Sequence, residues 1–274
     1  MAPAQADKAV ILARGLGTRM RRAENGTVLD PRQEAVAQTG LKALIPIKRP
    51  FLDYVLSALA DAGYGQVCLV VAPEHEAIRR YYDEQARPER LAIHYAVQQE
   101  PKGTADAVAA AEAFAGSDPF LVVNSDNYYP AEALVGLRRQ SGSATALFEQ
   151  AGMLAGSNIP AERIKSFAVG TFNGMGTLRQ ILEKPDEATL ASLPRPLWLS
   201  MNCWRFGPSI FEACRHIRPS KRGELELPDA VQHAIDVLGE RFRVVKVRAA
   251  VLDLTSRSDI PAVAARLADV EVRL

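Results

Sequence analysis

The chain has 274 residues, a formal net charge of +1, and 48% hydrophobic and 24% charged residues. This length can bury a sizeable core, and the ordinary composition argues against disorder. A near-neutral chain lacks the basic excess of a general nucleic-acid binder, so we expect no nucleic acid as a partner. The sequence shows no cationic start followed by an apolar region and no apolar run of about 18 residues, so we expect a cytoplasmic protein without a membrane partner.

Cysteine and histidine residues argue against disulfides and zinc. Cys68, Cys203 and Cys214 are odd in number, far apart and set in apolar stretches, so we predict buried free thiols. The histidines have no spacing suited to a metal, so we expect no zinc site.

The first half of the chain alternates short apolar runs with helical patterns. The predicted strands are residues 8–12, 66–72, 91–97 and 119–124, and the predicted helices are residues 51–63, 75–86 and 104–115. Strands that alternate with helices need crossover connections, which predicts a mostly parallel sheet with helices on both faces. Ligands of such sheets bind at the carboxyl ends of the strands.

The second half is less regular. The predicted strands are residues 143–149, 163–172, 177–185 and 197–206, and the predicted helices are residues 208–217, 227–239 and 258–268. More strand and fewer crossovers predict an added mixed or antiparallel layer. No repeat, hexapeptide array or linker divides the sequence, so we predict one domain over residues 1–274.

The stretch "KAVILARGLGTRMRR", from Lys8 to Arg22, joins a strand directly to two glycines and several arginines. Glycines at a strand end let backbone N–H groups approach a phosphate chain, and Arg19 can hold two phosphate oxygens in a fork. No third glycine follows for a dinucleotide-binding pattern, and no Gly-Lys-Ser/Thr follows for a P-loop. The stretch therefore predicts an anion site of another kind.

Several short motifs, in chain order, resemble those of the sugar-1-phosphate nucleotidyltransferase (nucleotide-sugar pyrophosphorylase) family. They are "LARGLGTR" at 12–19, "KALIPI" at 42–47, "QQEPKGTADA" at 98–107, "VNSDN" at 123–127, "EKP" at 183–185, "RGELE" at 222–226 and "LD" at 252–253. The resemblance implies a GT-A-like nucleotidyltransferase fold, with a Rossmann-like mixed, mostly parallel sheet, helices on both faces and an added sugar-binding β layer. It also implies a nucleotide-binding half at about 1–140 and a sugar-phosphate-binding half at about 141–274.

The resemblance implies an enzyme that transfers a nucleotidyl group from an NTP to a sugar 1-phosphate, giving an NDP-sugar and pyrophosphate. All the reacting groups are anionic, so cations and a divalent metal, Mg²⁺, would neutralise charge and position the substrates. The NTP and the sugar 1-phosphate are the expected partners, with a weak preference for a pyrimidine base. The sequence leaves a homo-oligomer open.

The resemblance also assigns roles to individual residues. The catalytic cations are Arg19 and Lys42 on the triphosphate and Lys184 on the sugar phosphate. The remaining nucleotide-binding residues are Ala13, Gly15, Gly17, Thr18, Gln98, Gly103 and Thr104. The sugar-phosphate-binding residues are Asn124, Glu183, Lys184, Asn202 and Arg222, and the metal ligands are Asp126 and Asp253.

Three features depart from the family pattern. Arg14 stands where relatives often carry glycine or a small residue, and it either adds a phosphate contact or points to solvent. Ser125 replaces the common glycine before the metal aspartate. Residues 20–41 form a longer run than is usual, and "DPRQ" at 30–33 predicts a capped helix that ends at Thr39-Gly40. This insertion is either a surface decoration or a lid over the triphosphate, hinged at Asn25-Gly26 and Gly40.

Two other functions stay open on the sequence. Transferases that act on a non-sugar phosphate, such as cytidylyltransferases and molybdopterin nucleotidyltransferases, share the opening motif. A non-catalytic sensor of NDP-sugars would keep the binding residues, although joint retention of Arg19, Lys42, Asp126 and Lys184 argues against lost catalysis.

Overall fold

The computed structural model describes residues 6–23, 26–165, 167–183 and 185–274. Its strands are β1 (Lys8–Leu12), β2 (Gln66–Val71), β3 (Ala92–Val97), β4 (Phe120–Asn124), β5 (Asn127–Tyr128), β6 (Ala144–Glu149), β7 (Val169–Phe172), β8 (Leu178–Leu182), β9 (Trp198–Phe206), β10 (Arg243–Val247) and β11 (Leu252–Asp253). Its helices are α1 (Thr18–Arg21), α2 (Pro31–Thr39), α3 (Phe51–Asp61), α4 (Glu76–Arg80), α5 (Thr104–Ala110), α6 (Glu112–Ala115), α7 (Ala131–Arg138), α8 (Gln150–Gly156), α9 (Ala161–Ile164), α10 (Glu187–Ser192), α11 (Ser209–His216), α12 (Leu227–Asp236) and α13 (Asp259–Leu267). Lys42–Leu44 forms a 3₁₀ turn, and Tyr81–Ala86 continues α4 as a π-helical turn.

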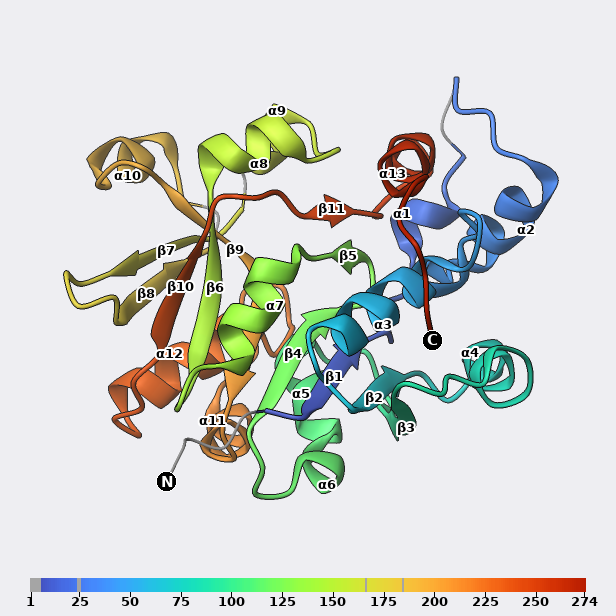
Figure 1. The fold of residues 1–274 in the computed structure, drawn as a ribbon. Helices are drawn as coiled ribbons and strands as arrows, with labels where there is room; N and C mark the ends of the chain where they lie inside the picture. Colours follow the sequence, from blue (N-terminus) through green and yellow to red (C-terminus); the bar gives the residue numbers. More distant parts are fainter. Residues whose placement is uncertain (1–5, 24–25, 166, 184) are drawn as a thin grey trace.

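A mixed sheet runs through the centre of the described structure in the order β10-β6-β9-β4-β1-β2-β3 (Figure 1). Strands β4, β1, β2 and β3 are parallel to one another, as the alternating pattern of the first half predicts. Strand β9 runs antiparallel between β4 and β6, while β10 pairs with β6 in parallel. The β7–β8 hairpin joins β9 at its edge and forms the predicted antiparallel addition. The predicted fold class is confirmed.

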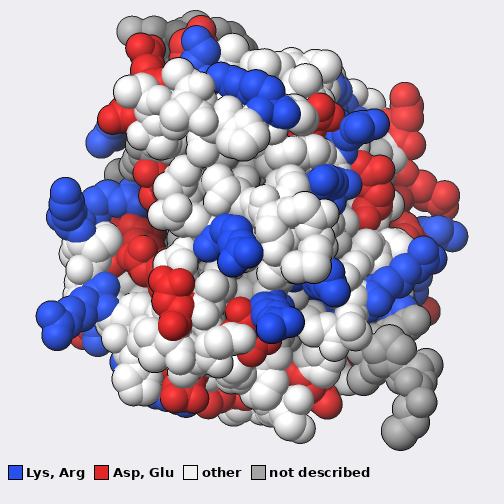
Figure 2. All heavy atoms as spheres, turned by 90° about the vertical axis from the view of Figure 1, so that its left-hand side faces the viewer, with Lys and Arg blue, Asp and Glu red and all other residues white. Residues whose placement is uncertain are grey.

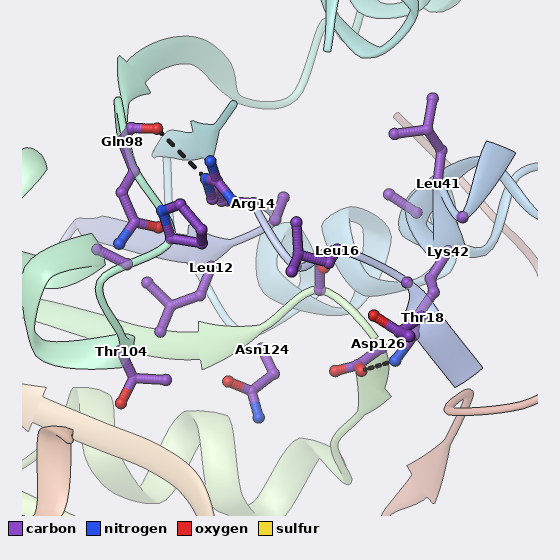
Figure 3. A pocket seen from close by; sticks show the side chains of 18 of the residues that line it. Leu12, Arg14, Leu16, Thr18, Leu41, Lys42, Gln98, Thr104, Asn124 and Asp126 are labelled. Atoms are coloured by element: carbon purple, nitrogen blue, oxygen red, sulfur yellow. Dashed lines mark hydrogen bonds and ion pairs between the residues drawn. The ribbon is translucent and has the colours of Figure 1, made fainter. Parts of the chain in front are cut away.

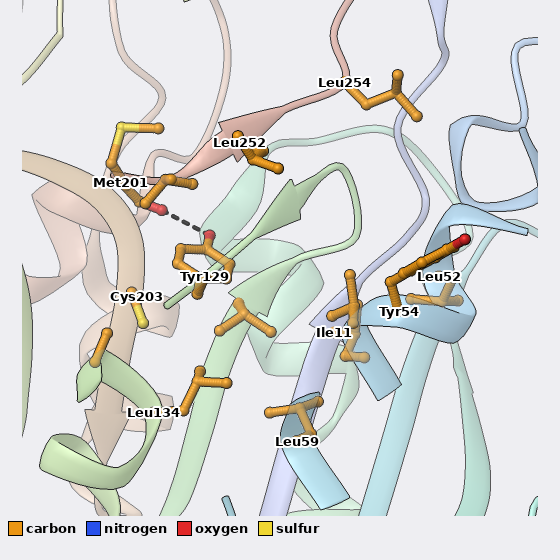
Figure 4. Packing of buried hydrophobic residues seen from close by; sticks show 14 of the residues in the cluster. Ile11, Leu52, Tyr54, Leu59, Tyr129, Leu134, Met201, Cys203, Leu252 and Leu254 are labelled. Atoms are coloured by element: carbon orange, nitrogen blue, oxygen red, sulfur yellow. Dashed lines mark hydrogen bonds between the residues drawn. The ribbon is translucent and has the colours of Figure 1, made fainter. Parts of the chain in front are cut away.

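Both faces of the sheet are covered by helices. The apolar side chains of β1 alternate between the two faces. Ala9 and Ile11 pack in one buried cluster, and Val10 packs in the other. Helices α3 and α7 contribute to the first cluster, whereas α5, α11 and α12 contribute to the second. Figure 4 shows Ile11 of the first cluster facing Leu59 of α3, which is fully buried. Such two-sided burial explains why β1 reads as a continuous apolar run.

The three cysteines are buried and free, as predicted. Burial raises the pKa of the Cys68 and Cys214 thiols to about 12. These thiols therefore stay protonated at neutral pH and act as small apolar groups in the core.

The prediction of one strand over residues 163–172 is wrong in its first part. Helix α9 occupies Ala161–Ile164, and the strand begins only at Val169. Pro160 stands directly before this helix, where a fixed φ and a missing N–H suit a helix start. Helices α7, α8 and α10 and strand β10 lie in segments for which the sequence patterns predicted no element.

The described surface shows no large field of one sign on the side occupied by β7, β8 and β10. Figure 2 shows this face with cationic and anionic side chains interspersed. None of the described helices is long and apolar enough to cross a membrane.

Candidate active site

A cavity of about 520 Å³ lies at the carboxyl ends of the parallel strands. The sheet register sets Leu12 at the end of β1 beside Val70 of β2 and Asn124 of β4. The backbone ladder continues past the strand ends, because Ala13 N donates to Val70 O at 2.9 Å and Ser125 N donates to Leu12 O at 3.1 Å. Segments that are far apart in sequence therefore enter one cavity.

Most of the predicted site residues line this cavity, and Figure 3 shows several of them. They are Ala13, Gly15, Gly17, Thr18, Arg19, Lys42, Gln98, Gly103, Thr104, Asn124, Asp126 and Asn202. Three other described residues, Glu183, Arg222 and Asp253, do not line it. Lys184 lies outside the described residues. The roles assigned to all these residues remain predictions.

The glycine loop is shaped by close packing against the insertion. Gly17 has φ of 61°, a left-handed conformation that glycine adopts without strain. A Cβ at Gly17 would lie 2.1 Å from the carbonyl oxygen of Gly40. By contrast, a Cβ at Gly15 would meet no atom within 4 Å. The loop is therefore tightly held at Gly17 and opens to the cavity at Gly15.

One end of the cavity holds a cation–carboxylate pair. Lys42 Nζ donates to Asp126 Oδ2 at 2.8 Å, and both side chains are partly exposed, at 19% and 25%. Lys42 comes from the 3₁₀ turn after the insertion, and Asp126 follows β4. The pair places a cation beside a carboxylate near the glycine loop (Figure 3).

Asp253 lies next to this end, on the strand that pairs with the Asp126 segment. Strand β11 is antiparallel to β5, with Asp253 opposite Asn127, and Leu254 N donates to Asp126 O at 2.8 Å. Arg163 Nη2 donates to Asp253 Oδ1 at 2.5 Å. Burial, followed by the negative charge of Asp126, raises the pKa of the Asp253 carboxyl. The two carboxylates are therefore close enough to repel each other.

Sequence reasoning missed Arg163 as the partner of Asp253. Its helix, α9, falls where a strand was predicted, so no signal pointed to a basic residue facing residue 253. Arg163 also reaches Asp259, at 3.6 Å from Nη1 to Oδ1. This arginine holds the Asp253 segment in place.

These carboxylates suit a hard divalent cation. Among the described residues, no group of three or more potential metal-ligating side chains occurs. A cation held at this place would have Asp126 and Asp253 as its carboxylates, and water and substrate phosphates would complete its shell, which is the usual arrangement for Mg²⁺. A cation here would offset the burial and the negative charge of Asp126, which together raise the pKa of the Asp253 carboxyl.

The opposite end of the cavity is built by the loop that follows β3. Gly103 has φ of 123°, and a Cβ there would lie 2.4 Å from Leu225 O. The 225 segment also receives a hydrogen bond from Ala105 N and donates one from Leu225 N to Lys102 O. The hydroxyl of Thr104 accepts a hydrogen bond from Leu227 N at 2.8 Å. The "RGELE" segment therefore packs against the loop that follows β3 and stabilises it.

Two asparagines, Asn124 and Asn202, also line the cavity. Asn124 Nδ2 donates to Asn127 Oδ1 at 3.0 Å, which orients its side chain. Asn202 has φ of 52°, which is uncommon for a residue with a side chain. Such strain is often held at ligand sites, and the sugar contact assigned to Asn202 stays a prediction.

Arg222 and Glu183 lie on exposed segments. Arg222 Nη2 donates to Glu226 Oε1 at 2.6 Å, with 54% of the Arg222 side chain exposed. Glu183 is also exposed. A role in holding sugar phosphate would require these side chains to approach the cavity when substrate binds.

The insertion contains the predicted helix. The Asp30 side chain accepts hydrogen bonds from Arg32 N and Gln33 N, Gln33 Oε1 accepts one from Asp30 N, and Gly40 ends the helix with φ of 77°. Arg257 Nη1 contacts Glu34 Oε2 at 2.5 Å, which ties the helix to the C-terminal region.

Gly40 and Leu41 at the end of the insertion line the cavity, so the insertion supports the glycine loop from its side. A lid motion stays a prediction, and its proposed hinge residue Asn25 lies outside the described residues.

Comparison with known proteins decides the family. The sequence model of the nucleotidyl transferase family matches residues 8–250. The chain belongs to the nucleotidyl transferase family. This confirms the family resemblance found in the sequence motifs. The matched region contains the whole cavity lining except Thr255.

The curated relatives of this chain include proteins named for nucleotidyl transfer. The chain is 31% identical over 230 residues to a glucose-1-phosphate thymidylyltransferase of Streptomyces griseus. It is 29% identical over 232 residues to the low-salt glycan biosynthesis nucleotidyltransferase Agl11 of Haloferax volcanii. These matches cover 84% of this chain and 57% of each relative, so the chain spans little more than half the length of either protein.

A relative of more similar length and a solved structure extend the comparison. The UTP–glucose-1-phosphate uridylyltransferase AglF of Haloferax volcanii is 28% identical over 228 residues, which is 82% of each chain. A crystal structure of UDP-glucose pyrophosphorylase complexed with UDP-glucose superposes with a TM-score of 0.73 at 19% identity, covering 97% of this chain and 100% of the other. The structural likeness shows that the fold is shared.

Proposed function

We propose that the protein transfers a nucleotidyl group from an NTP to a sugar 1-phosphate, releasing pyrophosphate. The observation that carries the proposal is the cavity itself, which gathers the glycine loop, Lys42, Asp126 and the Gln98 loop at the carboxyl ends of the parallel strands. The names of the relatives support the same reaction.

In this reaction an oxygen of the sugar phosphate attacks the α-phosphorus, and the bond from that phosphorus to the bridging oxygen breaks. The electron pair leaves with pyrophosphate, and no proton needs to be transferred. Because both partners are anionic, in-line positioning and neutralisation of charge supply most of the catalysis. A protein nucleophile is not required.

Arg19, which lines the cavity, would hold phosphate oxygens beside the open Gly15 backbone. Lys42 would stabilise the charge on the leaving pyrophosphate once it gives up its contact with Asp126 on substrate binding. Lys184 would hold the sugar phosphate, a role that rests on the family motif alone.

We propose Mg²⁺ as the cofactor, held by Asp126 and Asp253. When bound, it would supply positive charge for the triphosphate at the end of the cavity that holds these carboxylates. Asp126 would have to exchange Lys42 for the cation, whereas Arg163 and Asn127 keep Asp253 oriented. The cytoplasm, which supplies NTPs and sugar phosphates, is the proposed location.

A matrix of five NTPs against a panel of sugar 1-phosphates, read by pyrophosphate release with Mg²⁺, tests the proposal. We expect release with at least one pair and none without the sugar phosphate. NTP binding without release for any acceptor would instead support an NDP-sugar sensor. Release only with polyol phosphates or other non-sugar acceptors would assign the chain to a different transferase class.

A further inference from the structure

Arg14 is a buried cation on the cavity wall with few partners. Its exposed fraction is 8%, so it does not point to solvent as one reading of the sequence suggested. Nε donates to Gln98 O at 3.4 Å and Nη2 donates to Gln99 O at 3.5 Å, while Nη1 is buried with no hydrogen-bond partner. Both bonds exceed the usual length of about 2.7–3.2 Å. Within the described ranges, no carboxylate forms an ion pair with this guanidinium.

A guanidinium keeps its charge in proteins, so burial without a partner is unfavourable. The cavity is the open space beside Arg14, because the residue lines it. A ligand that offers an acceptor oxygen there would satisfy the guanidinium. Arg14 is therefore poised to exchange weak backbone contacts for a ligand contact.

The neighbouring Gln98 has a fixed amide orientation. Its Nε2 donates to Gly103 O at 3.0 Å and to Asp106 Oδ2 at 2.7 Å. A carbonyl and a carboxylate both accept, so the two contacts identify the nitrogen and use both of its hydrogens. The amide oxygen is left as the acceptor for a ligand, and Figure 3 shows it on the side of Leu12.

Arg14 and Gln98 lie at the end of the cavity opposite the proposed triphosphate site. Figure 3 shows Arg14 beside Gln98, whereas Lys42 and Asp126 lie across the cavity, beyond Leu16. A nucleotide with its phosphates on the glycine loop and Lys42 would bring its base toward Gln98. This placement rests on the proposed function.

A donor next to an acceptor matches only some bases. Uracil and thymine carry a ring N–H beside keto oxygens, and guanine carries a ring N–H beside its keto oxygen. Cytosine and adenine present the reverse pattern, a ring nitrogen that accepts beside an amino group that donates. With Arg14 as donor and the Gln98 oxygen as acceptor, the cavity suits the first group.

We infer that Arg14 is a base-specificity residue: when an NTP binds, its guanidinium donates to a keto oxygen of the base while the adjacent ring N–H donates to Gln98 Oε1. The site thus selects UTP, TTP or GTP against CTP and ATP. Arg14, which stands where relatives often carry glycine or a small residue, supplies this selection.

Calorimetric titration of each of the five NTPs with Mg²⁺, without sugar phosphate, tests the inference. The wild type should bind at least one keto nucleotide about tenfold or more tighter than CTP and ATP. Arg14→Met, which keeps much of the apolar stem, should weaken the preferred nucleotide about ten- to a hundredfold and change CTP and ATP less than about threefold. Arg80→Met, at an exposed arginine of α4 away from the cavity, should match the wild type.

Equal loss for all five NTPs in Arg14→Met would overturn the inference in favour of a phosphate contact, and so would no loss at all. Wild-type preference for ATP or CTP would also overturn it. A wild type that binds no NTP would instead refute the proposed function.

If Arg14→Met fails to fold, the wild type and thio analogues provide the test. Sulfur accepts hydrogen bonds poorly, so replacing one keto oxygen of the preferred base by sulfur should weaken binding about tenfold at one position. Unchanged binding of every thio analogue would overturn the inference.

Discussion

The two ends of the cavity differ in how the protein satisfies its own charged groups. At the Asp126 end, Lys42 neutralises Asp126, and Arg163 neutralises Asp253. At the Gln98 end, the amide is fixed by two acceptors, but the Arg14 guanidinium has only two long contacts. The first end must break an ion pair to receive substrate, whereas the second must give up only the two long backbone contacts of Arg14. The first end therefore changes its charge pairing when substrate binds, whereas the second keeps the Gln98 amide in place.

The largest expected effect is at the Asp126 carboxylate. We expect Asp126→Asn to lower kcat by roughly a thousandfold, since a lost metal contact removes several kcal/mol of charge stabilisation. Thermal unfolding should change little, because Asp126 is partly exposed. Pyrophosphate release in wild type and variant measures this effect. Asp118→Asn, at a surface pair with Lys8, is the matched control. Wild-type activity that persists in EDTA would refute the metal assignment.

The two lysines should divide the substrates between them. Lys42→Met removes a cation from the Asp126 end, where we propose that the triphosphate binds, and Lys184→Met removes the cation that the family motif assigns to sugar phosphate. Each should cost about ten- to a hundredfold on its own side, the usual effect of losing a charge-assisted hydrogen bond. Calorimetry with NTP alone should find Lys184→Met within a few-fold of wild type, and Lys42→Met should lose NTP binding or kcat. The reverse pattern would show that the two substrates are exchanged.

Variants of Gly15 and Gly17 should separate an effect on substrate access from an effect on the stability of the fold. Gly15→Val places methyl groups in open space, so we expect KM for NTP to rise about tenfold or more by obstruction, with the melting temperature nearly unchanged. Gly17→Val should lower the melting temperature clearly, because a left-handed residue with a Cβ costs about 1–2 kcal/mol before its clash with Gly40 O is counted. Kinetics and thermal unfolding of both variants check this. Equal melting temperatures for the two variants would contradict the packing described at Gly17.

The smallest expected effect is a pH dependence at His75, a buried histidine whose Nδ1 accepts a hydrogen bond from Ala72 N. Burial lowers the pKa of His75, so between the folded and unfolded pKa values the unfolded state binds more protons. Stability should therefore rise with pH through that window and fall as pH drops below about 6.5. Urea unfolding at pH 7.5 and 5.5 measures the difference, which His75→Gln should reduce. An unchanged difference in the variant would assign the effect to other groups.

Much of the fold could be predicted because its signals are local. The apolar runs of β1, β2, β3 and β4 and the capped helix α2 are complete within short stretches of sequence. Short elements were harder, since α9 has four residues and packs through Ile164, a residue that suits a strand equally well. Parallel pairing of β10 with β6 is a long-range choice that no local pattern shows.

The site could be predicted as residue types at strand ends but not as a set of contacts. Register brings Leu12, Val70 and Asn124 together, which is why motifs after separate strands share a cavity. The partners of these residues come from elsewhere: Arg163 meets Asp253 from α9, and Leu225 meets Gly103 from a late loop. Such contacts depend on how helices and loops from distant parts of the sequence pack together, so short motifs cannot predict them.

The magnesium dependence of NTP binding in wild type and Asp126→Asn tests the separation of the two ends most directly. Calorimetry of UTP and ATP, each with Mg²⁺ and with EDTA, gives both the metal dependence and the base preference. The wild type should bind the preferred nucleotide about tenfold or more tighter with Mg²⁺, and Asp126→Asn should lose this gain while keeping the base preference. A variant that keeps the full magnesium gain, or that loses the base preference together with it, would contradict the account.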